Sequence, residues 1–387
     1  MNILFYTRFV PDATFGGIER VSTVLCEVFR TRYRYNVYCI VPKREYANVH
    51  LETPFNDIFF IDPGKESEQI EKIIQEKAIT VVISQYANDP FNCLFGKIKT
   101  RYMIKLITAY HWMPGCEMLD IRNSLARKGG KIKRVIKKVL KPVYLTYCNR
   151  KINRSIRNAY IHSDRYVLLS ERFKEDFLSV FNIRDNGLKL RAIGNPLSFS
   201  HIEDPNKKLK QVLIVSRHEE SQKRLMTALQ IWKKLMAIHP SVSDWQLVLV
   251  GEGPDTGCYK RYVCENQMRN VIFVGKQDPR MYYRTARIFM MTSLYEGFGV
   301  TLTEAQQYKV VPVVFDSFSS VHDIITHEKN GILIRNNDLD RYVDELYSLM
   351  TDENKYRVLA EAGEQSCKKF SRESIAEQWN SLFHELI

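Results

Sequence analysis

At residues 295–305 the chain reads YEGFGVTLTEA. The segment follows a mostly apolar run at residues 287–291 that is typical of a buried strand, and it opens a predicted helix. Its two glycines let backbone amides approach a ligand closely, and a helix start offers unpaired N–H groups and the positive end of the helix dipole. A strand, a glycine-containing loop and a helix in this order predict an α/β domain with a site for phosphate oxygens.

Short runs rich in β-branched residues alternate with helical patterns along the rest of the chain, which is typical of parallel α/β sheets. The predicted strands form two series, which are residues 3–9, 36–41, 80–84, 103–109, 166–170 and 189–193, and then residues 211–215, 245–250, 271–274, 287–291 and 310–315. Two such series predict two doubly wound, Rossmann-like domains that face a cleft at the carboxyl ends of their strands.

The length of 387 residues exceeds what one hydrophobic core usually supports, so two domains are expected. Residues 196–210 are polar, contain two prolines and separate the two series of strands. We therefore expect an N-terminal domain at residues 1–195, a linker at residues 196–210, a C-terminal domain at residues 211–370 and a terminal helix at residues 371–387.

The composition is that of an ordinary folded protein, with 45% hydrophobic and 26% charged residues. The eight cysteines are scattered and form no Cys-x-x-Cys pair, so neither a zinc site nor a disulfide framework is expected. The N-terminus lacks the pattern of a signal peptide, and no run approaches the roughly 18 apolar residues of a membrane span. A cytoplasmic location is therefore expected.

The net charge of +13 belongs to one segment of the chain. Residues 121–163 contain thirteen Lys and Arg residues and no Asp or Glu, while the remainder has 44 basic and 44 acidic residues. We call residues 121–163 the basic insertion. An excess of charge confined to one insertion indicates a dedicated role for that insertion.

The basic insertion has an amphipathic helical pattern at residues 131–143. Its apolar positions are Ile132, Val135, Ile136, Val139, Leu140 and Val143, and its cations are Lys131, Lys133, Arg134, Lys137, Lys138 and Lys141. Such a helix, in which Pro142 should limit how far it runs undistorted, is expected to bind an anionic membrane surface. The alternatives are a packed helix with a solvated basic face and an acceptor-binding surface. No DNA or RNA module accompanies the charge, so nucleic acid is not an expected partner.

The segment at residues 295–305 resembles the Glu-x-x-x-x-x-x-x-Glu motif of the retaining GT-B glycosyltransferases of family four. Other segments resemble the same family in the same order along the chain, and these are Gly16-Gly17-Ile18-Glu19-Arg20, Asn195-Pro196, Leu249-Val250-Gly251-Glu252-Gly253-Pro254, Val274-Gly275 and Asn330-Gly331. The resemblance therefore covers essentially the whole chain. It implies the GT-B architecture, with the C-terminal helix crossing back to the N-terminal domain.

The resemblance also implies roles for residues in the C-terminal domain. Glu304 would hold the ribose hydroxyls of the nucleotide, while Glu296 and the amides of Gly297, Phe298 and Gly299 would contact the donor sugar. Arg217 and Lys223 match the cations that neutralise the donor pyrophosphate in the family. Fixed cations at this point stabilise the charge that develops on the leaving group more than they stabilise the ground state.

In the N-terminal domain, the resemblance points to Gly16, Gly17 and His111. The glycine pair would permit close approach of the backbone to the donor phosphates or to the acceptor, and His111 would lie close to the reacting sugar. No residue resembles an obligatory metal ligand. The Asp-x-Asp sequence that ends at Asp340 stands at the start of a late helix, where Asp338 is better explained as the N-cap.

Together these features predict a retaining, metal-independent hexosyltransferase that uses a UDP-sugar or a GDP-sugar and no cofactor. The expected acceptor is a glycan or a lipid-linked molecule in surface polysaccharide or lipopolysaccharide assembly, met at the inner face of the plasma membrane by a peripherally associated enzyme. Two alternatives remain open. One is a hydrolysing sugar-nucleotide epimerase, and the other is a non-catalytic module that binds a sugar nucleotide or a membrane.

Overall fold

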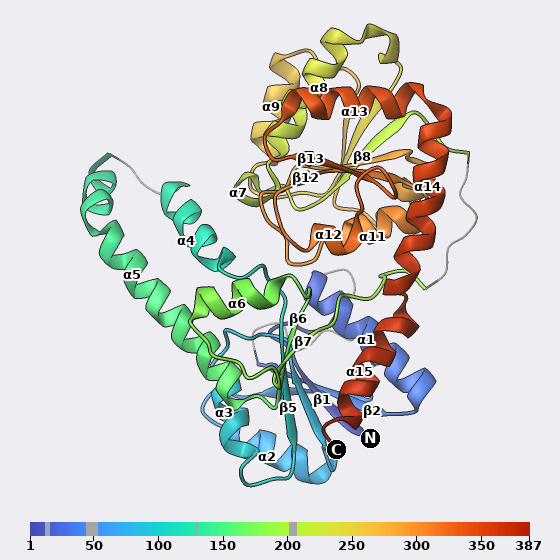
Figure 1. Cartoon of the computed structure of the whole chain (residues 1–387). Coiled ribbons are helices and arrows are strands. Elements are labelled where there is room, and N and C mark those ends of the chain that lie inside the picture. Colours follow the sequence, from blue (N-terminus) through green and yellow to red (C-terminus); the bar gives the residue numbers. More distant parts are fainter. Residues whose placement is uncertain (12–15, 44–52, 128–130, 201–206) are drawn as a thin grey trace. The chain divides into compact units, whose positions relative to one another are not determined.

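The chain forms two compact units in the computed structural model (Figure 1). Unit 1 comprises Met1–Ser198 and Arg372–Ile387, and unit 2 comprises Phe199–Ser371. The structure describes residues 1–11, 16–43, 53–127, 131–200 and 207–387, and it describes side chains outside residues 124–140. The boundary between the units at residues 198 and 199 lies within the segment predicted as the linker.

Unit 1 is built on a seven-stranded parallel sheet with the order β3-β2-β1-β4-β5-β6-β7. Its strands are β1 (Asn2–Tyr6), β2 (Asn36–Pro42), β3 (Asp57–Ile61), β4 (Val81–Ser84), β5 (Lys105–Tyr110), β6 (Arg165–Leu168) and β7 (Leu190–Ala192). The order reverses direction between β1 and β4. In a doubly wound sheet, ligands bind beyond the carboxyl ends of the strands near such a switch point.

The helices of unit 1 are α1 (Gly17–Tyr33), α2 (Glu66–Glu76), α3 (Phe91–Ile98), α4 (Cys116–Arg127), α5 (Lys131–His162), α6 (Phe173–Phe181) and α15 (Arg372–His384). The last of these, α15, packs on α1, where Phe383 contacts Phe29 with ring centroids 5.4 Å apart. The hydroxyl of Tyr35 also donates to Asn380 at 2.6 Å. The prediction that the C-terminal helix crosses back to the N-terminal domain is therefore confirmed.

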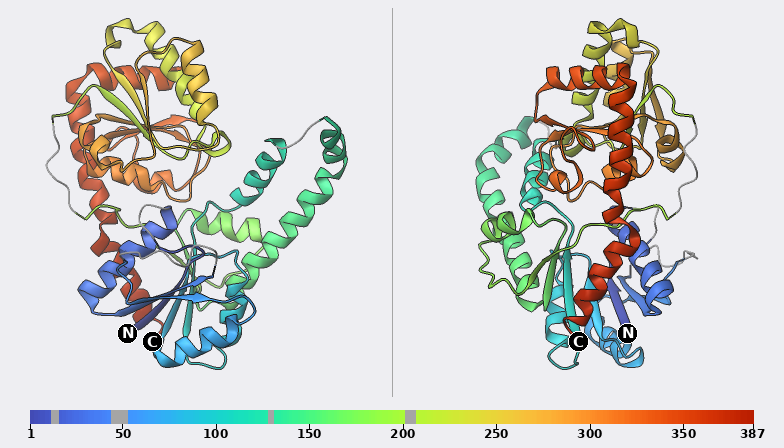
Figure 2. Two further views of the ribbon diagram at one scale, coloured as in Figure 1. Left: turned by 180° about the vertical axis from the view of Figure 1, so that it is seen from behind. Right: turned by 45° about the vertical axis from the view of Figure 1, so that its right-hand side comes forward.

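Helix α5 extends away from the sheet of unit 1, with α4 beside its far end (Figures 1 and 2). It runs for 32 residues with Pro142 inside it, so this proline, which was expected to limit how far the helix runs undistorted, does not end the helix. The C-terminal part of α5 anchors it, because Ile156 and Ala159 are fully buried. Beyond that anchor, Val143 is 69% exposed and Tyr147 is 61% exposed. The predicted apolar and basic faces of residues 131–140 lie outside the side chains that the structure describes.

Unit 2 is built on a six-stranded parallel sheet with the order β10-β9-β8-β11-β12-β13. Its strands are β8 (Gln211–Val215), β9 (Gln246–Val250), β10 (Val271–Gly275), β11 (Ile288–Met291), β12 (Val311–Asp316) and β13 (Ile332–Arg335). Its helices are α7 (Glu220–Lys223), α8 (Leu225–Ile238), α9 (Thr256–Glu265), α10 (Arg280–Thr285), α11 (Val300–Gln307), α12 (Val321–Ile324), α13 (Leu339–Thr351) and α14 (Glu353–Cys367). A core that includes Trp232, Trp245 and Tyr342 joins these helices to the sheet.

The predicted fold class of two Rossmann-like domains is confirmed, and each predicted strand overlaps an observed one. The sequence interpretation missed β3 and β13, which are edge strands. Edge strands are short or half exposed, so they lack the continuous apolar run of a central strand in a parallel sheet. The side chain of Asp338 accepts a hydrogen bond of 3.0 Å from the backbone N–H of Arg341, so its predicted role as an N-cap is confirmed.

Among the described residues, no helix is both long enough and apolar enough to span a membrane.

Candidate functional site

Lys223 and Glu296 form a largely buried ion pair beyond the carboxyl ends of β8 and β11. The ammonium of Lys223 lies 2.6 Å from Oε1 and 2.9 Å from Oε2 of Glu296. The two side chains are only 17% and 10% exposed. Removing one partner from such a pair leaves an uncompensated charge with little access to water. These two residues, predicted to act on the same donor, are therefore brought into direct contact.

The chain on either side of this pair is held together by further hydrogen bonds. The backbone N–H of Leu294 donates to the carbonyl of Gln222 at 2.7 Å, and the hydroxyl of Thr292 donates to the carbonyl of Lys223 at 3.0 Å. The hydroxyl of Ser293 donates to Oε1 of Glu296 at 2.6 Å. A small cavity beside the pair is lined in part by Ser216, Ser293 and Glu296. The loop after β11 is thus tied to the end of α7.

The glycine segment at residues 297–299 leads into α11, as the sequence predicts. Gly299 has a φ of 93°, a backbone conformation that residues with a side chain rarely adopt. The side chain of Phe298 is buried against Phe370, with ring centroids 5.2 Å apart, so only its backbone is available to a ligand. In the described part of the chain, no hydrogen bond engages the backbone N–H groups of residues 297–299. These amides are suited to bind an anion.

Glu304 is fully buried within unit 2. Its Oε2 atom accepts a hydrogen bond of 3.0 Å from the hydroxyl of Tyr283. A ribose can reach this carboxylate only if the atoms that cover it move. The role implied for Glu304 by the family resemblance therefore requires a rearrangement of its surroundings.

Arg217 follows β8 and is 63% exposed, and its guanidinium pairs with Glu219 at 2.5 Å. No described contact joins it to Lys223 or Glu296. Arg224, the residue after Lys223, has a structural role. It donates hydrogen bonds to Asn336 and Asn337, and its guanidinium lies over the ring of Phe315. Of the cations near α7, Lys223 is the one that contacts the glutamate of the predicted motif.

Gly251 and Gly253 allow the loop after β9 to pack against the loop after β8. A Cβ atom on Gly251 would lie 1.9 Å from the carbonyl oxygen of Ser216, and one on Gly253 would lie 2.4 Å from that of His218. Neither position accepts a side chain without a shift of backbone. The sequence interpretation recognised these glycines by resemblance only, and the close approach gives their physical reason.

In unit 1, His111 follows the carboxyl end of β5 and Gln85 follows that of β4. The Nε2 atom of His111 lies 2.5 Å from Oε1 of Gln85. Burial lowers the pKa of His111 to about 4, so the ring is neutral at pH 7. With its proton on Nε2 and donated to Gln85, the ring offers Nδ1 as an acceptor. Gln85 was not singled out from the sequence.

Gly16 and Gly17 stand at the start of α1, which begins at Gly17. A Cβ atom on Gly16 would lie 2.5 Å from Oε2 of Glu19, whose Oε1 accepts a hydrogen bond of 2.6 Å from the hydroxyl of Tyr86. Glu19 is buried, and it is a further polar residue of this region that the sequence interpretation did not assign. Gly16 therefore leaves room for the carboxylate of Glu19.

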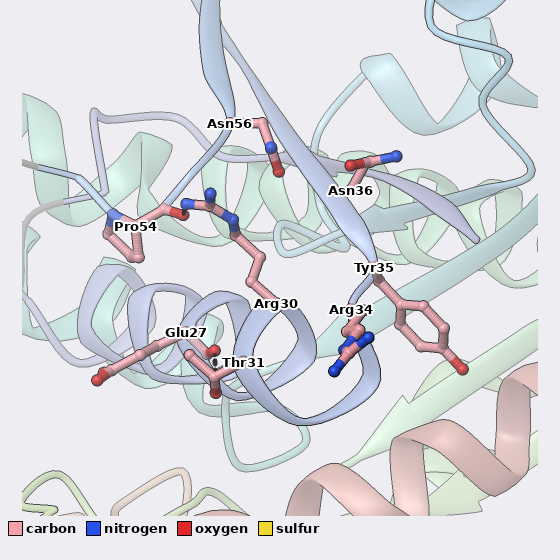
Figure 3. Close-up of a pocket in the computed structure, with 8 residues that line it drawn as sticks. All are labelled: Glu27, Arg30, Thr31, Arg34, Tyr35, Asn36, Pro54 and Asn56. Carbon is pink, nitrogen blue, oxygen red and sulfur yellow. Dashed lines mark hydrogen bonds between the residues drawn. The ribbon is translucent and has the colours of Figure 1, made fainter.

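A cavity of about 410 Å³ in unit 1 lies away from these residues (Figure 3). It is lined by the end of α1, the first residues of β2 and the chain before β3, and Arg30 reaches across to the carbonyl oxygen of Pro54. This is the amino end of β2, whereas His111 follows the carboxyl end of β5. Parallel strands place these ends on opposite edges of the sheet, so the cavity is separate from the predicted site.

The two parallel sheets, with unpaired amides and a buried Lys–Glu pair at the carboxyl edge of the second, are those of a protein of the GT-B architecture. Residues 198–366 match the model of the family Glycosyl transferases group 1, and this region of the chain belongs to that family. The chain is similar to the amylovoran biosynthesis glycosyltransferase AmsD of Erwinia amylovora, with 26% identity over 57% of this chain. The similarity spans 62% of that relative's length, which is less than two thirds.

Two solved structures share the whole fold. The lipopolysaccharide outer core galactosyltransferase WaaB matches with a TM-score of 0.69 and 17% identity, covering 100% of both chains. The Anabaena protein HepE, solved in complex with UDP-glucose, matches with a TM-score of 0.72 and 14% identity, again over 100% of both chains. At these identities the likeness establishes the fold of this chain.

Proposed function

We propose that the chain is a retaining glycosyltransferase that transfers a hexose from a nucleotide diphosphate sugar to a glycan or lipid-linked acceptor. The observation that carries this proposal is the contact between Lys223 and Glu296 beside the free amides of residues 297–299. A cation, a carboxylate and unpaired N–H groups at one helix start suit a ligand that joins a diphosphate to a polyol.

In the proposed reaction, the bond between the anomeric carbon and the donor phosphate oxygen breaks, and the acceptor oxygen bonds to the same face of that carbon. The proton of the acceptor hydroxyl passes to the departing phosphate oxygen. Lys223, assisted by Arg217, meets the negative charge that develops on the diphosphate. A two-step route with Glu296 as nucleophile is the less favoured mechanism.

The proposed donor is a UDP-sugar or a GDP-sugar, and no cofactor or metal ion takes part. The UDP-glucose complex of the structurally similar HepE makes UDP-glucose the first donor to test. The names of the Erwinia relative and of WaaB favour a role in surface polysaccharide or lipopolysaccharide assembly. In unit 1, the neutral ring of His111 and the start of α1 at Gly16 and Gly17 would face the reacting sugar.

The proposed site of action is the inner face of the plasma membrane, reached through residues 131–143 of α5. The described part of this helix supports contact with an interface, because Val143, Tyr144 and Tyr147 are exposed, as is the cation Lys141. Tyrosine rings are favoured at the level of lipid headgroups, and lysines are attracted to anionic lipids. We therefore propose peripheral membrane association of a cytoplasmic enzyme.

A panel of UDP-, GDP- and dTDP-sugars tests the function, with binding followed by thermal shift and turnover followed with and without glycan acceptors. A transferase releases nucleoside diphosphate only when an acceptor is present, and NMR of the product should show that the anomeric configuration is kept. Release without acceptor would identify a hydrolysing epimerase, and binding without release a non-catalytic module. Turnover should persist in EDTA, and loss that manganese restores would refute the metal-free mechanism.

A further inference from the structure

The carboxylate of Glu296 accepts hydrogen bonds from Ser293 as well as from Lys223. Its side chain is 3% exposed, and its hydroxyl donates to Oε1 of Glu296 at 2.6 Å. The backbone at this point is fixed as well, since the hydroxyl of Ser317 donates to the carbonyl of Ser293 at 2.6 Å. The donor of this hydrogen bond therefore stands on a rigid part of the loop that follows β11.

The proposed function requires Lys223 to change partners. In the structure, its ammonium is directed at both oxygens of Glu296, yet the same ammonium is assigned to the donor diphosphate. When a diphosphate draws Lys223 away, Glu296 loses two of the hydrogen bonds that orient it. The side chain of Glu296 is only 10% exposed, so its orientation then depends on the hydrogen bond from Ser293 rather than on water.

We propose that Ser293 is a positioning residue, which keeps the carboxylate of Glu296 directed at the donor sugar after Lys223 has turned to the diphosphate. This role rests on the proposed transferase function. A hydrogen bond from a buried hydroxyl to a carboxylate is short and strong, and it does not compete with the diphosphate, because a neutral hydroxyl has much less affinity for phosphate than an ammonium. Ser293 thus separates the orientation of Glu296 from the binding of the donor.

The role predicts a change in turnover without a matching change in nucleotide affinity. In Ser293→Ala, we expect kcat to fall about 10- to 100-fold, which is the usual effect of one lost hydrogen bond to a charged group, while the Kd for the nucleoside diphosphate changes less than about 3-fold. Ser293→Thr keeps the hydroxyl and should recover most of kcat. Calorimetry with UDP or GDP and steady-state kinetics with the donor found for the wild-type chain provide both values.

Ser366→Ala is the matched control, because this serine also donates and accepts hydrogen bonds within unit 2 but lies on α14. It should reduce thermal stability as much as Ser293→Ala does, with kcat within about 2-fold of wild type. A Ser293→Ala variant with wild-type kcat, or with kcat and nucleotide affinity lowered equally, overturns the positioning role alone. If the wild-type chain turns over no donor, the proposed function fails and this role fails with it.

Discussion

The hydroxyl of Tyr283 donates a hydrogen bond of 3.0 Å to the fully buried carboxylate of Glu304. Tyr283 belongs to α10 and is itself buried, with its ring stacked on that of Tyr308 at a centroid distance of 5.9 Å. A buried carboxylate requires donors, and an aromatic ring packed on its neighbours presents its hydroxyl in a fixed direction. The second glutamate of the predicted motif is therefore oriented by a residue of a different helix.

Replacing Tyr283 by Phe should lower the free energy of unfolding by about 1–3 kcal/mol, because a buried charge loses a hydrogen-bond donor. Urea unfolding of the variant and the wild type measures this difference. Tyr282→Phe is the control, since the hydroxyl of Tyr282 donates to Gln277 at the exposed surface. The control should change stability by less than about 0.5 kcal/mol. Equal losses in both variants would show that the contact with Glu304 does not matter.

Lys223 and Glu296 should have opposite effects on nucleotide binding, although they form one ion pair. Lys223→Ala removes a phosphate ligand and should weaken the binding of a nucleoside diphosphate about 10-fold or more. Glu296→Gln removes the group that competes for Lys223, so it should bind the nucleotide at least as tightly as wild type while turnover falls. Calorimetric titration with UDP and GDP measures both, with Glu304→Ala as a reference for lost ribose contact. Weaker binding in Glu296→Gln would contradict the exchange of partners.

Residues 131–143 of α5 should bind anionic membranes. Reversing the charges of Lys133, Arg134, Lys137 and Lys138 should abolish sedimentation with anionic liposomes and leave nucleotide affinity unchanged. Binding of the wild type should weaken with salt, because exposed charges are screened beyond about 10 Å at 0.1 M ionic strength. Liposomes of neutral lipid are the control. If the wild type ignores anionic liposomes at low salt, the helix is a solvated surface or binds the acceptor.

Lys208 should make the stability of unit 2 depend on pH. Its ammonium donates to the carbonyls of Tyr283 and Tyr308 at 3.0 and 2.7 Å, yet burial lowers its pKa from 10.5 to about 7. Between these two values the unfolded chain binds more protons at this position than the folded chain does, so stability should rise with pH from about 7 towards 10. Chemical unfolding of wild type and Lys208→Met between pH 6 and 9.5 tests this. The difference between their free energies of unfolding should shift in favour of wild type as pH rises, and a constant difference would contradict the lowered pKa.

Sequence patterns predicted the parts of the fold that depend on continuous apolar runs, since a central strand of a parallel sheet is buried on both faces. They could not predict β3 or β13, whose edge positions demand less burial. The pattern also predicted that Pro142 limits how far its helix runs undistorted, and α5 continues through this proline. A proline removes one backbone donor, and an exposed helix can leave the corresponding carbonyl to water.

The candidate site was predictable where one short segment carries it, as with Glu296 and the glycines that follow. Contacts across the fold were not predictable. A partner of Glu304 is Tyr283, on a preceding helix, and His111 pairs with Gln85, which follows a different strand. A pairing of this kind depends on side-chain direction after folding. A polar residue within two positions of the end of a predicted strand, such as Ser293 or Gln85, was the available signal, because such positions gather at the ligand-binding edge of a parallel sheet.

The return of α15 to unit 1 has a consequence for synthesis on the ribosome. Phe29 is translated before unit 2, but Phe383, which packs on it, is translated after unit 2, as is Arg372, which donates to the carbonyls of Leu197 and Ser198. Unit 2 is one continuous stretch of the chain, so all its residues are synthesised before the last helix of unit 1. Unit 1, which is begun first, is therefore completed only after unit 2, and until α15 is synthesised the apolar surface of α1 lacks its cover.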